Sequence, residues 1–214
     1  MKMPSKKATT RVPIHSLLSE RFSTRAFDPQ KPVNFGAILS LFEAARWAPS
    51  CFNDQPWRFV FWDRFTNKSG WDRAFLCLTP GNQKWAVNAQ VLIATVARSH
   101  FAHDIGSNRW GGHDTGMATM ALLVEAQAQG LVAHVMGGFD PRKLSQEFGI
   151  PEGFEPMSII ALGYPGNPEA LEPDLRAREL GERIREPLDH ILFEGEWAQP
   201  LRDRTDFHEP PSNA

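Results

Sequence analysis

Apolar residues recur along this chain in two kinds of pattern, and the patterns predict alternating helices and strands. Helical patterns mark residues 35–47, 116–129 and 142–149. Largely apolar stretches of strand length mark residues 59–62, 91–97, 131–136 and 157–162. Residues 13–18 favour a short helix, residues 67–78 have mixed periodicity, and residues 80–82 predict a turn. Polar residues bound the apolar run at 91–97, so we expect that strand to be buried on both faces.

Local signals mark where two of these helices begin or end. Asn34 is a suitable N-cap for the helix at 35–47, because its side chain can accept a bond from a free backbone amide. Asp114 and Thr115 are expected to open the helix at 116–129, and Gly130 stands where a left-handed residue commonly ends a helix.

The densest chemistry lies between the first long helix and the first strand, at residues 46–57. Pro49 and Pro56 remove backbone donors and fix the direction of the chain. Ser50, Asn53 and Gln55 lie between them and carry hydroxyl and amide groups that can bond the edge of a heteroaromatic ring. A rigid polar loop between a helix and a strand is a common position for a binding site.

Three further segments are candidates for binding an anionic ligand. Arg21 and Arg25 flank Ser23 and Thr24, and guanidinium groups alternating with hydroxyls suit a phosphate, although an arginine pair alone is more often a solvated turn. Gly137 and Gly138 follow a predicted strand and would let backbone amides approach a ligand, although a glycine pair alone indicates only a turn. Arg183 and Arg185 lie late in the chain.

Length, composition and charge restrict the class of protein. The 214 residues suit one domain, and 42% apolar with 22% charged residues is ordinary for a globular protein. A net charge of −2 gives no broad attraction for nucleic acid or an anionic membrane, so any anionic ligand must be met by a local cluster of cations. No apolar run approaches the roughly 20 residues of a membrane span, and no secretory signal is visible. We expect a cytoplasmic protein with neither a nucleic-acid nor a membrane partner.

The cysteines and histidines offer weaker candidates. Cys51 lies in the dense loop, and a small packed residue is the favoured interpretation over a reactive thiol. His100, His103 and Asp104 could bind a metal, but without a second ligand pair the glycine-rich segment 99–113 serves equally well as a mobile lid. We therefore predict no metal site.

Composition also suggests where the domain begins and ends. Residues 1–12 are expected to be a flexible leader, residues 13–198 a single domain, and residues 199–214 a disordered tail. From about residue 167 the chain turns to charge and proline, which indicates an arm. Its apolar patch, Ile191, Leu192, Phe193 and Trp197, should dock on another surface, such as a second subunit.

With these residues laid out, the chain resembles the flavin-dependent nitroreductase family. The resemblance rests on four features in the family's order, which span the chain from Glu20 to Trp197. They are Arg21, Phe22, Ser23, Thr24, Arg25; Ala48, Pro49, Ser50 with Asn53, Gln55, Pro56, Trp57; Gly137, Gly138, Phe139, Asp140; and Arg183, Arg185, Pro187.

The resemblance implies an α+β fold, an α/β/α sandwich with a mixed, largely antiparallel central sheet, working as a homodimer with FMN at the subunit interface. It assigns Arg21, Ser23, Arg25, Arg183 and Arg185 to the phosphate, ribityl chain and pyrimidine edge of the flavin. It assigns Gly137 and Gly138 to the N5 and O4 edge. It places Pro49, Ser50, Asn53 and Gln55 on the partner subunit's flavin. Gly137 departs from the larger or acidic residue of many members.

The function implied is hydride transfer from NAD(P)H through FMN to a small acceptor such as a nitroaromatic or quinone, by a ping-pong mechanism. No catalytic side chain is required, since the flavin carries the redox chemistry, and Arg25 is a candidate for stabilising charge near N1. The alternatives are a non-catalytic flavin-binding or storage protein, a specialised reductase of the same family (enone reduction or dehalogenation), and a metal hydrolase built on His100, His103 and Asp104.

Overall fold

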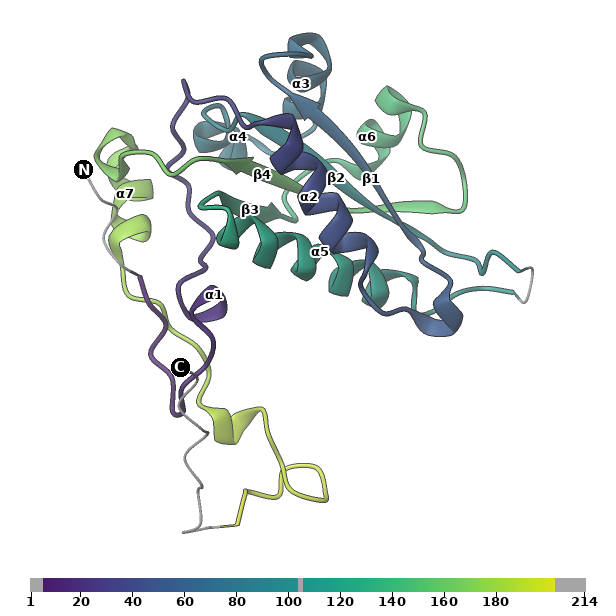
Figure 1. Cartoon of the computed structure of the whole chain (residues 1–214), viewed down its shortest axis with the longest axis vertical. Helices are drawn as coiled ribbons and strands as arrows, with labels where there is room; N and C mark the ends of the chain where they lie inside the picture. Colours follow the sequence, from purple (N-terminus) through teal and green to yellow (C-terminus); the bar gives the residue numbers. More distant parts are fainter. Residues whose placement is uncertain (1–5, 104–105, 203–214) are drawn as a thin grey trace.

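A computed structural model describes residues 6–103 and 106–202, and at its centre lies a four-stranded antiparallel sheet (Figure 1). The strands are β1 (Trp57–Asp63), β2 (Val91–Arg98), β3 (Val132–Met136) and β4 (Phe154–Gly163), in the spatial order β1-β2-β4-β3. The register pairs Phe61 with Ile93 and Ile93 with Ile160, so the two central strands are β2 and β4. Each of the three strand pairs in the described residues is antiparallel.

Alternate residues of the central strands enter two separate cores, one on each face of the sheet. Leu92 and Ala94 of β2 pack into one core, whereas Val91 and Ile93 pack into the other. All but the last residue of β2 are buried. The strand predicted at 91–97 is therefore buried on both faces, as expected for an apolar run without alternation.

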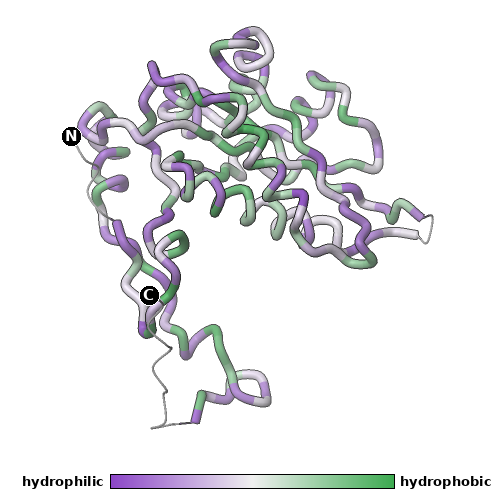
Figure 2. The backbone as a smooth tube through the Cα atoms, viewed as in Figure 1, coloured by the Kyte–Doolittle hydropathy of each residue, from purple (hydrophilic) through white to green (hydrophobic). Residues whose placement is uncertain are grey.

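Helices cover both faces (Figures 1 and 2). The helices α2 (Phe35–Arg46) and α5 (Gly111–Ala128) pack together on one face. The other core takes residues from α3 (Lys68–Phe75), α4 (Pro80–Ala86), α6 (Pro141–Phe148) and α7 (Pro173–Leu180). Short elements complete the chain: α1 (Ser16–Ser19), η1 (Cys51–Asn53), η2 (Pro168–Ala170) and η3 (Leu188–His190). The α+β sandwich is confirmed.

Two local predictions were wrong. Residues 80–82 do not form an isolated turn, because Pro80 is the first residue of α4 and Thr79 its N-cap. Proline suits this position, since its missing N–H would have no helical acceptor. The helix predicted from residue 116 begins at Gly111, where the main chain crowds the Arg98 carbonyl so closely that a Cβ would lie 2.3 Å from it. Its end is as predicted, with Gly130 at φ 70°.

The two ends of the described chain run side by side. Arg183 donates to the carbonyl of Lys6 at 2.6 Å, and Arg11 pairs with Asp189 at 2.9 Å. Beyond α7 the arm extends away from the body of the domain (Figure 1), where Ile191 is 66% exposed and Trp197 is 87% exposed. The apolar patch predicted on the arm is thus uncovered within a single chain.

Candidate functional site

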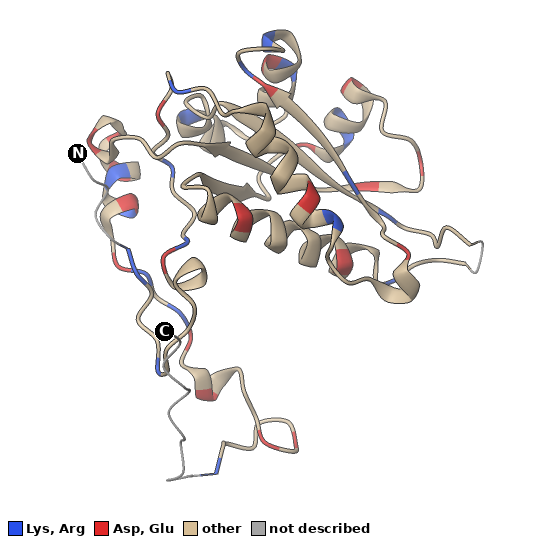
Figure 3. Cartoon of the chain, viewed as in Figure 1, with Lys and Arg blue, Asp and Glu red and all other residues tan. Residues whose placement is uncertain are grey.

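A cationic cavity of about 220 Å³ lies between the segment 21–25, α7 and the start of the arm. Basic residues recur along the segments on this side of the molecule (Figure 3). Six cationic and two acidic residues line the cavity: Lys6, Arg21, Arg25, Arg178, Arg183, Arg185, Glu179 and Glu182. Ser23 also lines it. Five residues predicted from separate parts of the sequence, at 21, 23, 25, 183 and 185, therefore share one cavity.

The arginines that line this cavity lack ion pairs within residues 6–103 and 106–202. Among the described residues, Arg21, Arg25, Arg183 and Arg185 form no ion pair with an Asp or Glu side chain. Burial lowers the pKa of Arg21, and the neighbouring Arg183 and Arg185 lower it further. Burial and Arg185 likewise lower the pKa of Arg183. Crowded guanidinium groups that repel one another favour binding of an anion with several acceptor oxygens.

A buried carboxylate on α7 holds the basic segment in place. Glu179 is 3% exposed and accepts bonds from the Thr24 hydroxyl and from the Arg25 backbone N–H, the latter at 2.9 Å. Because both oxygens are used by these donors, Glu179 fixes the backbone between Ser23 and Ala26 instead of neutralising the arginine side chains. Helix α7 thus fixes the conformation of the segment that carries Arg21 and Arg25.

A second cavity, of about 360 Å³, adjoins the first through Arg25 and Arg178, which line both. Gly137 and Gly138 form part of its wall. They follow Met136, the last residue that β3 pairs with β4, so their amides lie beyond the ladder. The Gly138 carbonyl accepts bonds from Asn82 Nδ2 at 2.9 Å and from the Thr79 backbone N–H at 3.0 Å. This turn is therefore fastened to the N-terminus of α4.

A neutral histidine lies in the second cavity. His134 Nδ1 is 2.9 Å from the Thr24 carbonyl, and its ring lies 4.4 Å from the ring of Trp85 between centroids. Burial lowers the pKa of His134 to about 4; the bond to Thr24 opposes this shift, while Arg25 and Arg21 add to it. Since Nδ1 must donate to the carbonyl, Nε2 of the neutral ring is an acceptor.

The dense loop has an unusual backbone. Phe52, Asn53 and Gln55 have φ values of 52°, 53° and 51°, in the left-handed region that non-glycine residues rarely adopt. Phe52 is 76% exposed, and Asn53 and Gln55 are also exposed. Strain of this kind persists only where surrounding contacts impose it, and it is frequent at binding sites.

Two buried aspartates impose this conformation. Asp114 of α5 accepts the Cys51 backbone N–H at 2.9 Å. The side chain of Asp54 is fully buried and accepts bonds from Arg98 Nη2 at 2.9 Å, the Ala102 N–H at 2.8 Å and Asn108 Nδ2 at 2.9 Å. Burial alone would raise the pKa of Asp54, but these donors outweigh it and lower the pKa. Ser50 Oγ completes the loop by accepting the Gln55 N–H at 3.0 Å.

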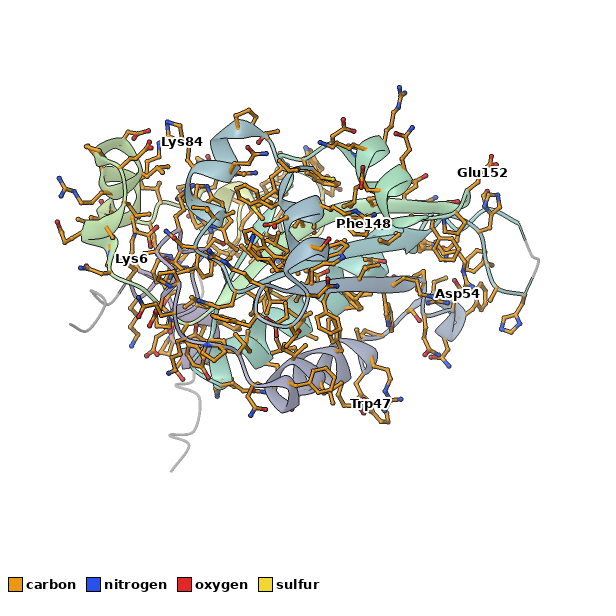
Figure 4. The ribbon with its side chains drawn as sticks, turned by 90° about the horizontal axis from the view of Figure 1, so that it is seen from above. Lys6, Trp47, Asp54, Lys84, Phe148 and Glu152 are labelled. Carbon is orange, nitrogen blue, oxygen red and sulfur yellow. The ribbon has the colours of Figure 1, made fainter. Side chains whose placement is uncertain are left out.

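The predicted site residues fall into two groups. Arg21, Ser23, Arg25, Gly137, Gly138, Arg183 and Arg185 surround the two adjoining cavities. Pro49, Ser50, Asn53 and Gln55 line neither of them. Figures 1 and 4 place the loop of Asp54 and the N-terminal segment of Lys6 at opposite ends of the molecule. One chain alone does not bring the two groups together.

The structure adds site residues that the sequence interpretation missed. Lys6, Asn82, His134 and Glu179 belong to the cavities or hold their walls. Asn82 had a local signal, since Thr79 and Pro80 together mark a helix N-terminus beside a predicted site. Lys6 and Glu179 had none, because Glu179 bonds both Lys6 and Arg25 from more than 150 residues away in the sequence.

The histidine-rich loop assembles no metal site in the part of the chain that the structure describes. No group of three His, Cys, Asp or Glu side chains there could hold an ion, and Asp104 lies outside the described residues. His100 Nδ1 is instead 3.1 Å from the Ser99 hydroxyl. Across residues 6–103 and 106–202, no helix is both long and apolar enough to cross a membrane.

Comparison with known proteins agrees with this geometry. The sequence model of the Nitroreductase family matches residues 18–164. A protein of Stenotrophomonas maltophilia (strain K279a), named "Putative NADH dehydrogenase/NAD(P)H nitroreductase Smlt0482", is 28% identical over 173 residues, covering 72% of this chain and 86% of that protein. An uncharacterized 15.4 kDa protein of Mycolicibacterium smegmatis is 34% identical over 124 residues, covering 58% of this chain and 82% of its own.

A solved structure described as an oxidoreductase containing FMN is also similar. It has a TM-score of 0.84 and 33% identity, and the match covers 93% of this chain and 100% of that one.

Proposed function

Because this chain belongs to the nitroreductase family, we propose that it is an FMN-dependent oxidoreductase that takes hydride from NAD(P)H and delivers it to a small acceptor. The observation that carries the proposal is the pair of adjoining cavities. One holds a cluster of arginines that form no ion pair with a carboxylate among the described residues, and the other has a glycine turn in its wall. A flavin mononucleotide carries a phosphate at one end of its ribityl chain and a ring at the other. The first cavity suits the phosphate and the second suits the ring, so the donor set fits this cofactor.

The residues divide between these two parts. Arg21, Ser23, Arg183 and Arg185 would hold the phosphate and the adjacent chain, since forked guanidinium donors match phosphate oxygens. Arg25 lines both cavities and would reach toward the pyrimidine edge. Gly137 and Gly138 would present backbone amides to the opposite edge, because no side chain stands between the turn and the cavity.

FMN, when bound, supplies the two-electron chemistry that no side chain here can perform. The chain's own groups would orient the flavin and stabilise charge on its ring. The Arg25 cation would favour negative charge on the ring, and Glu179 keeps the Arg25 backbone in position. His134 presents only an acceptor at Nε2 and so would add no positive charge to this edge.

The proposal includes a homodimer in which Pro49, Ser50, Asn53 and Gln55 complete the partner's site. Those four residues lie away from the cavities of their own chain, yet they are held in a strained, exposed loop. The arm leaves Ile191 and Trp197 exposed, and an apolar depression of about 250 Å³ on α5 is lined by Met120, Leu123 and neighbouring residues. Apolar surfaces of this kind are typical of subunit interfaces.

The acceptor proposed is a small planar compound, such as a nitroaromatic or a quinone. Gly137 leaves open space at the second cavity, since no described atom beyond Gly137 and its two chain neighbours lies within 4 Å of the position that its Cβ would occupy. Both described cysteines are free thiols, which suits the reducing cytoplasm as the location of such an enzyme.

The proposal is tested by an absorbance spectrum of the purified protein, followed by anaerobic titration with NADH and NADPH in separate experiments. We expect a yellow protein whose visible absorbance disappears on addition of at least one nicotinamide and returns on addition of an acceptor. A yellow protein that neither nicotinamide bleaches would instead be a flavin-storage protein. A colourless protein that takes up no FMN would exclude both interpretations.

A further inference from the structure

The N-terminal segment, expected to be a flexible leader, contributes a side chain to the cationic cavity. Lys6 is half-buried, and its ammonium nitrogen donates to the Glu179 carbonyl at 2.5 Å and lies 5.5 Å from the centre of the Phe22 ring. It lines the cavity together with Arg21, Arg183 and Arg185. Figure 4 labels it at the end of the molecule that carries α7.

The backbone of this segment is tied down on both sides. The Ala8 N–H donates to the Ser19 carbonyl at 2.8 Å. Arg183 Nη1 donates to two carbonyls, that of Lys6 at 2.6 Å and that of Ser19 at 2.9 Å. One arginine of the arm therefore bonds both Lys6 and Ser19, which lies two residues before the basic segment, so Lys6 is anchored beside the arginines.

We propose that Lys6 is a further phosphate-binding residue of the cationic cavity, held there by the backbone bonds of Lys6 and Ala8. The inference rests on the proposed function, since it takes the ligand to be the phosphate of FMN. A lysine ammonium has several N–H donors, and the bond to Glu179 uses one of them. Lys6 forms no ion pair with a carboxylate in the described residues.

Lys7 provides a matched control within the same segment. It carries the same charge and is exposed, but it lines only a neighbouring cavity and not the one that contains Arg21 and Arg185. Lys6→Met and Lys7→Met change the net charge equally. Any difference between them therefore reports the position of the cation and not the total charge.

The test is equilibrium binding of FMN and of riboflavin, which lacks the phosphate, to the flavin-free full-length chain. We expect Lys6→Met to weaken FMN binding by roughly ten-fold to one hundred-fold, the range for a lost bond to a charged group. Riboflavin binding should stay within about two-fold, and Lys7→Met should leave both ligands unaffected. Lys6→Arg, which keeps the cation, should retain most of the FMN affinity.

Several outcomes would overturn the inference. Equal loss of FMN and riboflavin affinity would make Lys6 a structural residue of the cavity, and unchanged FMN affinity would exclude it from the site. If the wild-type chain bound no FMN, the proposed function would fail first. Inorganic phosphate would then decide on Lys6: a rise in melting temperature in wild type and Lys7→Met but not in Lys6→Met would support an anion site, and any other pattern would not.

Discussion

At the scale of single residues, the two glycines of the turn at 137–138 have different roles. A Cβ on Gly138 would lie 2.7 Å from Asn82 Nδ2 and 2.8 Å from Thr79 Oγ1, the groups that bond its carbonyl. Gly137 has no such neighbour and no positive φ. Gly138 is therefore closely packed against the side chains that bond its carbonyl, whereas Gly137 leaves space beside the second cavity.

We predict that Gly138→Ala lowers the free energy of unfolding by about 1–3 kcal/mol, because Asn82 and Thr79 must move and lose their bonds to the turn. Gly137→Ala should change it by less than about 0.5 kcal/mol. Urea denaturation of both variants, monitored by circular dichroism, measures the difference. Equal destabilisation by the two substitutions would contradict the packing argument.

His134 predicts a specific pH dependence of stability. Its pKa is lowered from 6.5 to about 4 in the folded chain, mainly by burial. Between these values the unfolded chain binds a proton that the folded chain does not, so the free energy of unfolding should decrease as pH falls through this window. The shift corresponds to roughly 3 kcal/mol, lost by about pH 4.

The variant His134→Asn isolates this contribution. The asparagine amide can donate to the Thr24 carbonyl in place of Nδ1, but it does not titrate. Urea denaturation at several pH values between 7 and 4 should show the stability of wild type converging on, or falling below, that of the variant. A difference between the two proteins that stays constant with pH would show that His134 does not cause the effect.

At the scale of elements, the dense loop depends on contacts that join segments distant in sequence. Asp54 bonds Arg98 at the end of β2 and also Ala102 and Asn108 in the following loop. One buried carboxylate therefore fixes the loop that carries Asn53 and Gln55 and the segment that leads into α5.

Asp54→Asn should destabilise the protein by about 3 kcal/mol or more, because it leaves the Arg98 cation without its buried partner. Asp72→Asn is the matched control. It breaks the pair with Lys68, whose side chain is 60% exposed, and should cost less than about 1 kcal/mol. Urea denaturation compares the two variants, and similar losses would contradict a structural role for Asp54.

Elements with strong local signals were predicted well from the sequence. Asn34 caps α2 as expected, accepting the Gly36 N–H at 2.7 Å, and the helix spans Phe35–Arg46. Where an element depends on contacts from elsewhere, local reasoning failed. Gly111 begins α5 against the Arg98 carbonyl, and nothing in the sequence around residue 111 reports that contact. For the same reason, local reasoning did not identify Glu179, whose partners lie in the distant segment 24–25.

At the scale of the whole molecule, the site candidates occupy two ends of one chain. The arginine cavities lie beside α7, and the strained loop lies at the far end of the domain (Figure 1). Residue types alone suggested each group, and the family resemblance supplied the expectation that both serve one ligand. A single-chain sequence pattern cannot assign a contact between subunits, so this part of the site stays a prediction.

Complementation between two defective variants tests whether the loop of one subunit completes the flavin site of the other. Arg21→Ala/Arg25→Ala removes cations from the cavity, and Asn53→Gly/Gln55→Gly removes the side chains of the strained loop while glycine still accepts the positive φ. Each double variant alone should bind little FMN. If the site spans two subunits, a mixed dimer contains one intact site and one doubly defective site. In the isolated mixed dimers, roughly half of the sites should then bind FMN with wild-type affinity.

The measurement is FMN bound per chain after co-expression of the two variants under separate affinity tags, with mixed dimers isolated through both. Recovery of tight binding only in mixed dimers requires that the arginines of one chain and the loop of another meet at one ligand. If the mixed dimers bind no better than either parent, the loop does not act across the interface. The positive φ angles of the loop would then be only a consequence of the local contacts that Asp54 and Asp114 make.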